Sequence, residues 1–150
     1  MYEVKCPEIY KADDRPSIFL AGGISNCSDW QDYAVQRLSN LDIQLINPRR
    51  SDFDITDINM TVNQIMWEYN HLIEANAILF YFTEETVCPI TLYELGVHAK
   101  PTYKKIFVAC HPNYVRKIDV ITQLGLINPS VLVYNSLDDM LDSINRFYNE

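Results

Sequence analysis

A run of six residues near the middle of the chain constrains the fold more than any other feature. Ala77-Ile78-Leu79-Phe80-Tyr81-Phe82 is almost continuously apolar, which is typical of a strand buried on both faces in a parallel sheet. A strand that alternated polar and apolar residues would instead leave one face in water. We therefore expect this run to be the central strand of a sheet that is covered by helices on both sides.

Strands and helices alternate along the rest of the chain. Four further strands are indicated by short apolar runs, at residues 17–21, 42–46, 105–110 and 130–134. Helices are expected from Ser28 to about Ser39, from Thr61 to about Ala75, around Glu94, from about Asn113 to Leu124, and after a Ser136 cap. Strict alternation predicts an α/β protein with a doubly wound, Rossmann-like or flavodoxin-like sheet. We expect five parallel strands in the order 2-1-3-4-5 within a three-layer α/β/α arrangement.

Two of the expected helices open with the pattern of a capping box, in which Ser or Thr is followed three residues later by Glu or Gln. Ser28 with Gln31 marks one helix start, and Thr61 with Gln64 marks the next. The polar connection between them, residues 47–60, is longer than a routine loop, and long loops are often functional.

Bulk properties favour a single domain that acts on a small molecule. The chain has 150 residues, of which 48% are hydrophobic, enough for one continuous core. We expect one domain over residues 1–150, with residues 1–16 as a loosely ordered lead-in. The net charge of −8 argues against binding to a nucleic acid duplex, which requires clustered Lys and Arg.

The same properties indicate where the protein works. No apolar run approaches the roughly 20 residues of a membrane span, and the first residues do not resemble a signal peptide. We therefore expect a cytoplasmic protein without a membrane partner. The four cysteines lack CxxC spacing and are expected to be reduced thiols, with no metal and no cofactor.

Glu94 is the residue that most directly indicates chemistry. It lies in the opening turns of the expected helix after the buried strand, and a helix N-terminus carries about half a positive elementary charge. We expect the carboxylate to stay ionised as a nucleophile, although it can also merely complement the helix dipole. Ligands of doubly wound sheets bind beyond the carboxyl ends of the strands, where the strand order reverses. Because Gly22-Gly23, residues 83–91 and this helix start all reach that edge, Glu94 is predicted to lie in a pocket.

Three motifs extend the case over most of the chain: residues 18–23, Trp67-Glu68 with residues 72–76, and residues 91–96. In this order and spacing they resemble the nucleoside 2-deoxyribosyltransferase-like proteins, which include nucleoside and nucleotide N-glycosidases. The resemblance implies that Glu94 attacks the anomeric carbon of a sugar and forms a covalent glycosyl-enzyme intermediate. It implies that Glu68, where relatives commonly have Asp, contacts the sugar or assists proton transfer. Tyr93 would orient Glu94 or belong to the core.

The resemblance also implies a set of substrate-binding residues: Phe19, Gly22, Gly23, Arg49, Trp67, Cys88 and Thr91. The two glycines would let a sugar or phosphate approach the backbone, or serve as an ordinary turn. Arg49 would pair with a phosphate or remain solvated, and Trp67 would stack on a base or belong to the core. Cys88 stands where deoxyribosyltransferases have an acidic residue that contacts the base.

The leading hypothesis is an enzyme that cleaves or transfers the N-glycosidic bond of a (deoxy)nucleoside or nucleoside 5′-monophosphate through Glu94. One alternative is a non-catalytic nucleotide-binding or sensing module of the same fold. Another is a flavodoxin-like signalling domain, for which an acidic cluster is expected where Gly22-Gly23 stands. Relatives generally assemble as homodimers or larger homo-oligomers, in which a neighbouring subunit closes each pocket.

Overall fold

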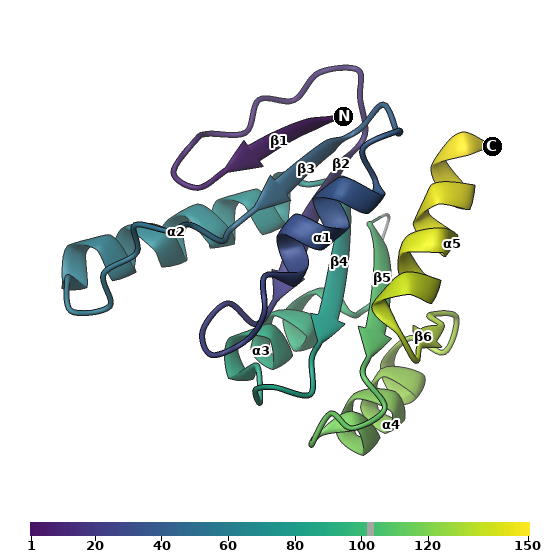
Figure 1. The fold of residues 1–150 in the computed structure, drawn as a ribbon. Coiled ribbons are helices and arrows are strands. Elements are labelled where there is room, and N and C mark those ends of the chain that lie inside the picture. Colours follow the sequence, from purple (N-terminus) through teal and green to yellow (C-terminus); the bar gives the residue numbers. More distant parts are fainter. Residues whose placement is uncertain (102–103) are drawn as a thin grey trace.

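The central apolar run forms strand β4, Ala77–Phe82, which is buried along its whole length. A computed structural model of the protein describes residues 1–101 and 104–150. Its sheet has six parallel strands in the order β1-β3-β2-β4-β5-β6 (Figure 1). The other strands are β1 Tyr2–Lys5, β2 Ser17–Gly22, β3 Gln44–Asn47, β5 Lys105–Cys110 and β6 Val133–Tyr134.

The predicted strand order is confirmed, because β2 to β6 are arranged as 2-1-3-4-5. Strand β1 adds a sixth strand at the edge, where Tyr2 to Lys5 pair with Gln44 to Asn47 of β3. These four residues depart from the expected loosely ordered lead-in. Only Val4 among them is buried, so this edge strand lacks the apolar run by which the interior strands were recognised.

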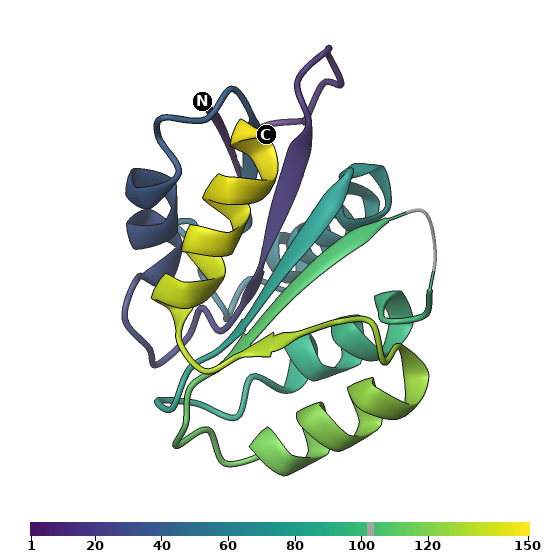
Figure 2. The same ribbon diagram turned by 90° about the vertical axis from the view of Figure 1, so that its right-hand side faces the viewer.

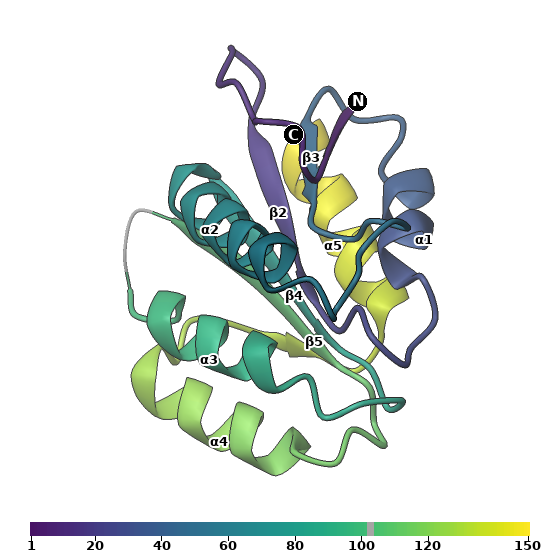
Figure 3. The same ribbon diagram turned by 90° about the vertical axis from the view of Figure 1, so that its left-hand side faces the viewer.

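Within the described residues, five helices cover the two faces of the sheet, as the expected three-layer arrangement requires. They are α1 Trp30–Arg37, α2 Ile58–Glu74, α3 Pro89–His98, α4 Lys117–Ile127 and α5 Leu137–Asn149. Figures 2 and 3 show α2, α3 and α4 on one face and α1 and α5 on the other. Alternate residues of β4 belong to different core clusters: Ile78 and Phe80 pack with α2 and α3, whereas Leu79 packs with α1 and α5.

Two helices begin at aspartate caps and not at the predicted capping boxes. Asp29 accepts a hydrogen bond from Asp32 N (3.0 Å) at the start of α1, and Asp57 accepts one from Met60 N (3.1 Å) at the start of α2. Asp is as good an N-cap as Ser and better than Thr, so the local sequence offered two starts in each case. Gln64 consequently lies in the interior of α2, where its side chain is available for other contacts.

Near the C-terminus the elements are shorter or later than predicted. Helix α4 begins at Lys117, not near residue 113, because Tyr114 N donates to His111 O (2.9 Å) in a preceding turn. Strand β6 comprises only Val133 and Tyr134, because a turn in which Val131 N donates to Asn128 O (3.1 Å) comes before it. Within the described residues, no helix combines the length and apolar character needed to cross a membrane.

Candidate active site

The loops after β2 and β4 meet at the carboxyl edge of the sheet. Strand β2 pairs with β3 on one side and β4 on the other, so the strand order reverses there, which is the position where doubly wound folds bind ligands. A Cβ placed on Gly23 would lie 3.1 Å from Cys88 Sγ and 3.3 Å from Cys27 Sγ. The β2–α1 loop and the start of α3 are therefore in direct contact.

Two carboxyl groups from helices α2 and α3, which cover the same face of the sheet (Figure 3), form the candidate chemical centre. Glu94 of α3 and Glu68 of α2 are both half-buried. Burial raises the pKa of Glu68 to about 7, while a hydrogen bond from Gln64 opposes that change. Burial, and then the negative charge of Glu68, raise the pKa of Glu94 to about 8.

The expectation that the helix dipole keeps Glu94 ionised is wrong. Glu94 is the sixth residue of α3, which has no acidic residue in its first turn, and the effect of the dipole falls off within that turn. Burial and the charge of Glu68 both favour the protonated acid instead. The two carboxyls titrate as a pair, and at neutral pH the pair retains a proton.

A carboxylate beside a carboxylic acid is the set of groups that a retaining glycosyl transfer uses. One group acts as the nucleophile at the anomeric carbon, and the other donates a proton to the leaving group. Metal chemistry has no comparable set of ligands here: within residues 1–101 and 104–150, no group of three or more His, Cys, Asp or Glu side chains is placed to hold an ion.

Gln64 joins this pair to the sheet, a role that sequence reasoning missed. Its Nε2 donates to Glu68 Oε1 (3.4 Å) and to Pro48 O (2.9 Å), and its Oε1 accepts from Cys6 Sγ (2.9 Å). The sequence signal was available in the four-residue spacing to Glu68, which places both side chains on one face of a helix. We had assigned Gln64 to a capping box with Thr61.

The side chain of Tyr93 points away from the protein. It is 73% exposed, and no hydrogen bond within the described residues joins it to Glu94. The proposed role of orienting Glu94, and the alternative role in the core, both disagree with this placement. Thr91, three residues before Glu94 in α3, is by contrast buried.

Trp67 and Phe19 belong to the core, which is the second of the two roles predicted for Trp67 and disagrees with the substrate-binding role predicted for Phe19. Trp67 is 6% exposed and stacks on His71 with ring centroids 4.0 Å apart. Its Nε1 donates to Glu8 O (2.7 Å), and Phe19 packs against it from β2. The segment after β1 thus covers the indole, for which the other predicted role was stacking on a base.

The glycines at the end of β2 make room for other protein groups. A Cβ on Gly22 would lie 2.3 Å from Trp30 Cζ2 and 2.8 Å from Tyr81 O, and one on Gly23 would lie 2.9 Å from Thr86 Cγ2. The prediction for these glycines was either a close approach of a ligand to their backbone or an ordinary turn out of the strand. Other protein atoms fill the space that a side chain would take at Gly22 and Gly23. These residues would therefore contact a ligand only through their backbone groups.

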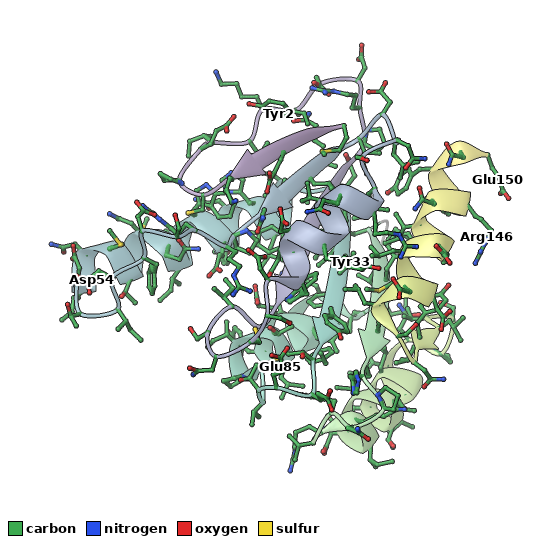
Figure 4. The ribbon with its side chains drawn as sticks, in the orientation of Figure 1. Tyr2, Tyr33, Asp54, Glu85, Arg146 and Glu150 are labelled. Atoms are coloured by element: carbon green, nitrogen blue, oxygen red, sulfur yellow. The ribbon has the colours of Figure 1, made fainter. Side chains whose placement is uncertain are left out.

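Two charged residues, Arg49 and Glu85, bind the β2–α1 loop. Arg49 donates from Nη1 to Ser28 O (2.8 Å) and from Nη2 to Cys27 O (2.9 Å). Glu85, labelled in Figure 4, accepts from Ser28 N (3.1 Å) and Ser28 Oγ (2.7 Å). The hydrogen bonds from the side chain and backbone of Ser28 are the main reason that the pKa of Glu85 is lowered. Arg49 therefore holds the loop in place, whereas we had expected it to bind a phosphate or to be solvated.

Fold and site together define a class: doubly wound α/β proteins with a pair of interacting carboxyls on two helices that cover one face of the sheet. The chain belongs to the nucleoside 2-deoxyribosyltransferase-like family, whose profile matches residues 15–114. A crystal structure of a conserved protein from Enterococcus faecalis V583 is similar, with a TM-score of 0.59 and 17% sequence identity. The similarity covers 89% of this chain and 99% of that one, and it shows the shared fold. Comparison with curated proteins gives no match.

Proposed function

We propose that the protein cleaves or transfers the N-glycosidic bond of a (deoxy)nucleoside or nucleoside 5′-monophosphate, with Glu94 as nucleophile and Glu68 as proton donor. The family indicates a glycosyl-transferring enzyme with a small nucleoside substrate. The observation that supports these two residues as the reacting pair is that both carboxyls are half-buried on two helices and have raised pKa values, while the role of nucleophile for Glu94 follows from its place in the family motif. Neither group is paired with a cation in the part of the chain that the structure describes.

In the first proposed step, the Glu94 carboxylate forms a bond to the anomeric carbon as the bond from that carbon to the base nitrogen breaks. The departing nitrogen takes the bonding electrons and the proton of Glu68. Positive charge develops on the sugar in the transition state, and it favours the arrangement in which Glu94 is ionised and Glu68 holds the shared proton.

In the second step, the glycosyl-Glu94 ester is resolved by an acceptor. Glu68, now a carboxylate, takes the proton of a water or of a second base as that acceptor attacks the anomeric carbon and Glu94 leaves. Water gives hydrolysis, and a base gives exchange. The same pair serves both outcomes, so the acceptor decides whether the enzyme is a hydrolase or a transferase.

The proposed assembly is a homodimer or larger homo-oligomer formed through helix α2. Its N-terminal half projects beyond the sheet (Figure 1), and one face carries exposed apolar side chains, each 47–76% exposed: Ile58, Val62, Ile65, Met66, Tyr69 and Ile73. Such a stripe on a monomer marks an interaction site. Ile65→Arg should shift the protein towards monomer in light scattering, whereas Leu126→Arg on α4, at an even more exposed position, should not. Equal behaviour of the two variants would contradict an α2 interface.

The test of the activity is base release from a panel of ribo- and deoxyribonucleosides and their 5′-monophosphates, followed by chromatography with and without a second free base. Release should fall at least a thousandfold in Glu94→Gln, because covalent catalysis loses its nucleophile. The matched control is Glu74→Gln, which neutralises an exposed carboxylate on α2 and should leave the rate unchanged.

A covalent intermediate gives a second readout. A nucleoside with a slow-turnover 2-fluoro sugar should add the mass of its glycosyl group to the peptide that carries Glu94. Release that persists in Glu94→Gln would contradict the proposal. Tight binding of nucleosides without release from any substrate would identify a non-catalytic binding module instead.

A further inference from the structure

Gln64 is hydrogen-bonded to the carboxyl pair, and neither the family nor the proposed chemistry assigns it a part. We propose that Gln64 is a positioning residue that fixes the Glu68 carboxyl beside Glu94 by tying it to the ends of two strands. The catalytic consequence rests on the proposed function, whereas the positioning itself does not.

Both N–H groups and the carbonyl oxygen of the Gln64 amide have a hydrogen-bond partner. It is 8% exposed, and its two N–H groups face Pro48 O and Glu68 Oε1, while its carbonyl oxygen faces the Cys6 thiol. Turning the amide over would set its oxygen against the Pro48 carbonyl, which can only accept. The donor therefore faces Glu68 by necessity, and not by an arbitrary choice of amide orientation.

The anchors of Gln64 belong to the sheet. Pro48 directly follows β3, and Cys6 directly follows β1. Cys6 N donates to Asn47 O (3.1 Å), which extends the β1–β3 ladder by one bond. A side chain on α2 is thus fixed to two neighbouring strand ends, and Glu68, one helical turn further on, is fixed through it. A glutamate without such a contact would lose side-chain entropy on being ordered.

Few charged or titratable groups act on Glu68. Among the described residues, the Glu94 carboxyl on α3 and the Cys6 thiol at the end of β1 interact electrostatically with Glu68. The Cys6 sulfur in turn lies 4.0 Å from Arg50 Nη1. Arg50 is itself bound by Asp52, through Nε at 2.6 Å and Nη2 at 2.7 Å. The bond from Gln64 acts in the opposite direction to burial and lowers the pKa of Glu68. Without Gln64, the carboxyl would hold its proton to higher pH.

The test replaces Gln64 by Met, which has a similar length and no hydrogen-bonding amide. Carboxyl ¹³C NMR titration should show the Glu68 midpoint rising by roughly half a pH unit or more, because a hydrogen bond to the ionised form has been removed. The matched control is Gln36→Met on α1, where Gln36 Nε2 donates to Asp32 Oδ2 (2.7 Å) on an exposed face. That variant should leave the titration of Glu68 unchanged.

A second variant, Cys6→Ala, removes one anchor and leaves the bond from Gln64 to Glu68 in place. It should move the midpoint in the same direction by a smaller amount, and it keeps the test valid if Gln64→Met unfolds. Once a substrate is known, Gln64→Met should lower kcat about tenfold with little change in KM. It should also move the alkaline limb of the pH profile upward, because that limb reports the proton donor Glu68.

The two proposals fail in different ways. An unchanged Glu68 midpoint in both Gln64→Met and Cys6→Ala would overturn the positioning role, whatever the activity. A shifted midpoint in a protein that releases no base would support the positioning role and count against the proposed function. The NMR readout needs no substrate, so it can be made before any substrate is known.

Discussion

The contact between Gly22 and Trp30 makes the sharpest prediction about stability. A Cβ on Gly22 would lie 2.3 Å from Trp30 Cζ2 and 2.8 Å from Trp30 Cε2, where carbon atoms prefer about 3.5–4.0 Å. The indole must therefore retreat by about 1 Å or more in Gly22→Ala. It has little room, because Trp30 is 4% exposed and meets the Tyr81 ring edge-on at 5.3 Å.

The expected loss of stability has two sources. Overpacking a filled core costs about 1–3 kcal/mol, and displacing the indole stretches its hydrogen bond from Nε1 to Gly23 O (3.0 Å), a loss of about 1 kcal/mol. The neighbouring strand cannot yield either, because the same Cβ would lie 2.8 Å from Tyr81 O in the β2–β4 ladder. We expect Gly22→Ala to lose about 2–4 kcal/mol, or about 5–15 °C in Tm for a chain of this size.

Thermal and urea unfolding followed by circular dichroism measure this loss. The matched control is Gly96→Ala in α3, where a Cβ would meet no atom within 4 Å; it should gain about 0.5–1 kcal/mol from better helix propensity. The double variant Gly22→Ala/Trp30→Phe should be less destabilised than the sum of the single variants, by about 1 kcal/mol or more. Additive losses, or equal behaviour of the two glycine variants, would refute the steric explanation.

Three further predictions concern groups around the site. Burial raises the pKa of Glu94 from its usual 4.5 to about 8, so between these pH values the folded protein binds more protons at Glu94 than the unfolded chain does. The Tm measured by calorimetry should therefore fall as the pH rises from about 5 to about 8, and it should fall less in Glu94→Gln. Glu85→Gln weakens the charge-assisted bonds from Ser28, so hydrogen exchange at the Ser28 amide should accelerate. His71→Phe leaves the Tyr10 amide without its acceptor, His71 Nε2 at 2.9 Å, and should lower the unfolding free energy in urea by about 1–3 kcal/mol.

The arrangement of the sheet was predictable because the interior strands are apolar on both faces. That signal gave the order of β2 to β6, and it failed for β1, where only Val4 is buried. Helix starts were less predictable because adjacent polar residues compete. Ser28 and Asp29 are both good caps, and only the packing of α1 decides that Asp29 accepts the bond from Asp32 N.

The site was predictable as a pair of residues and not as an electrostatic environment. Glu94 and Glu68 stand in recognisable motifs, but their raised pKa values depend on how deeply the folded protein buries each side chain. Trp67, which precedes Glu68 in the sequence, illustrates the same limit. Trp67 is covered by Glu8 and stacks on His71, and no local pattern distinguishes a covered indole from one that is open to a ligand.

The carboxyl pair also bears on how such a protein changes over generations. Two half-buried acids that repel each other make the ionised pair unfavourable in the folded state, so exchanging either one for a neutral residue relieves that repulsion. Selection for stability alone would then remove Glu68 or Glu94, since strained active sites trade stability for activity. A lineage that keeps both residues is under continuing selection for what they do together, and one that loses them drifts towards a more stable, inactive descendant.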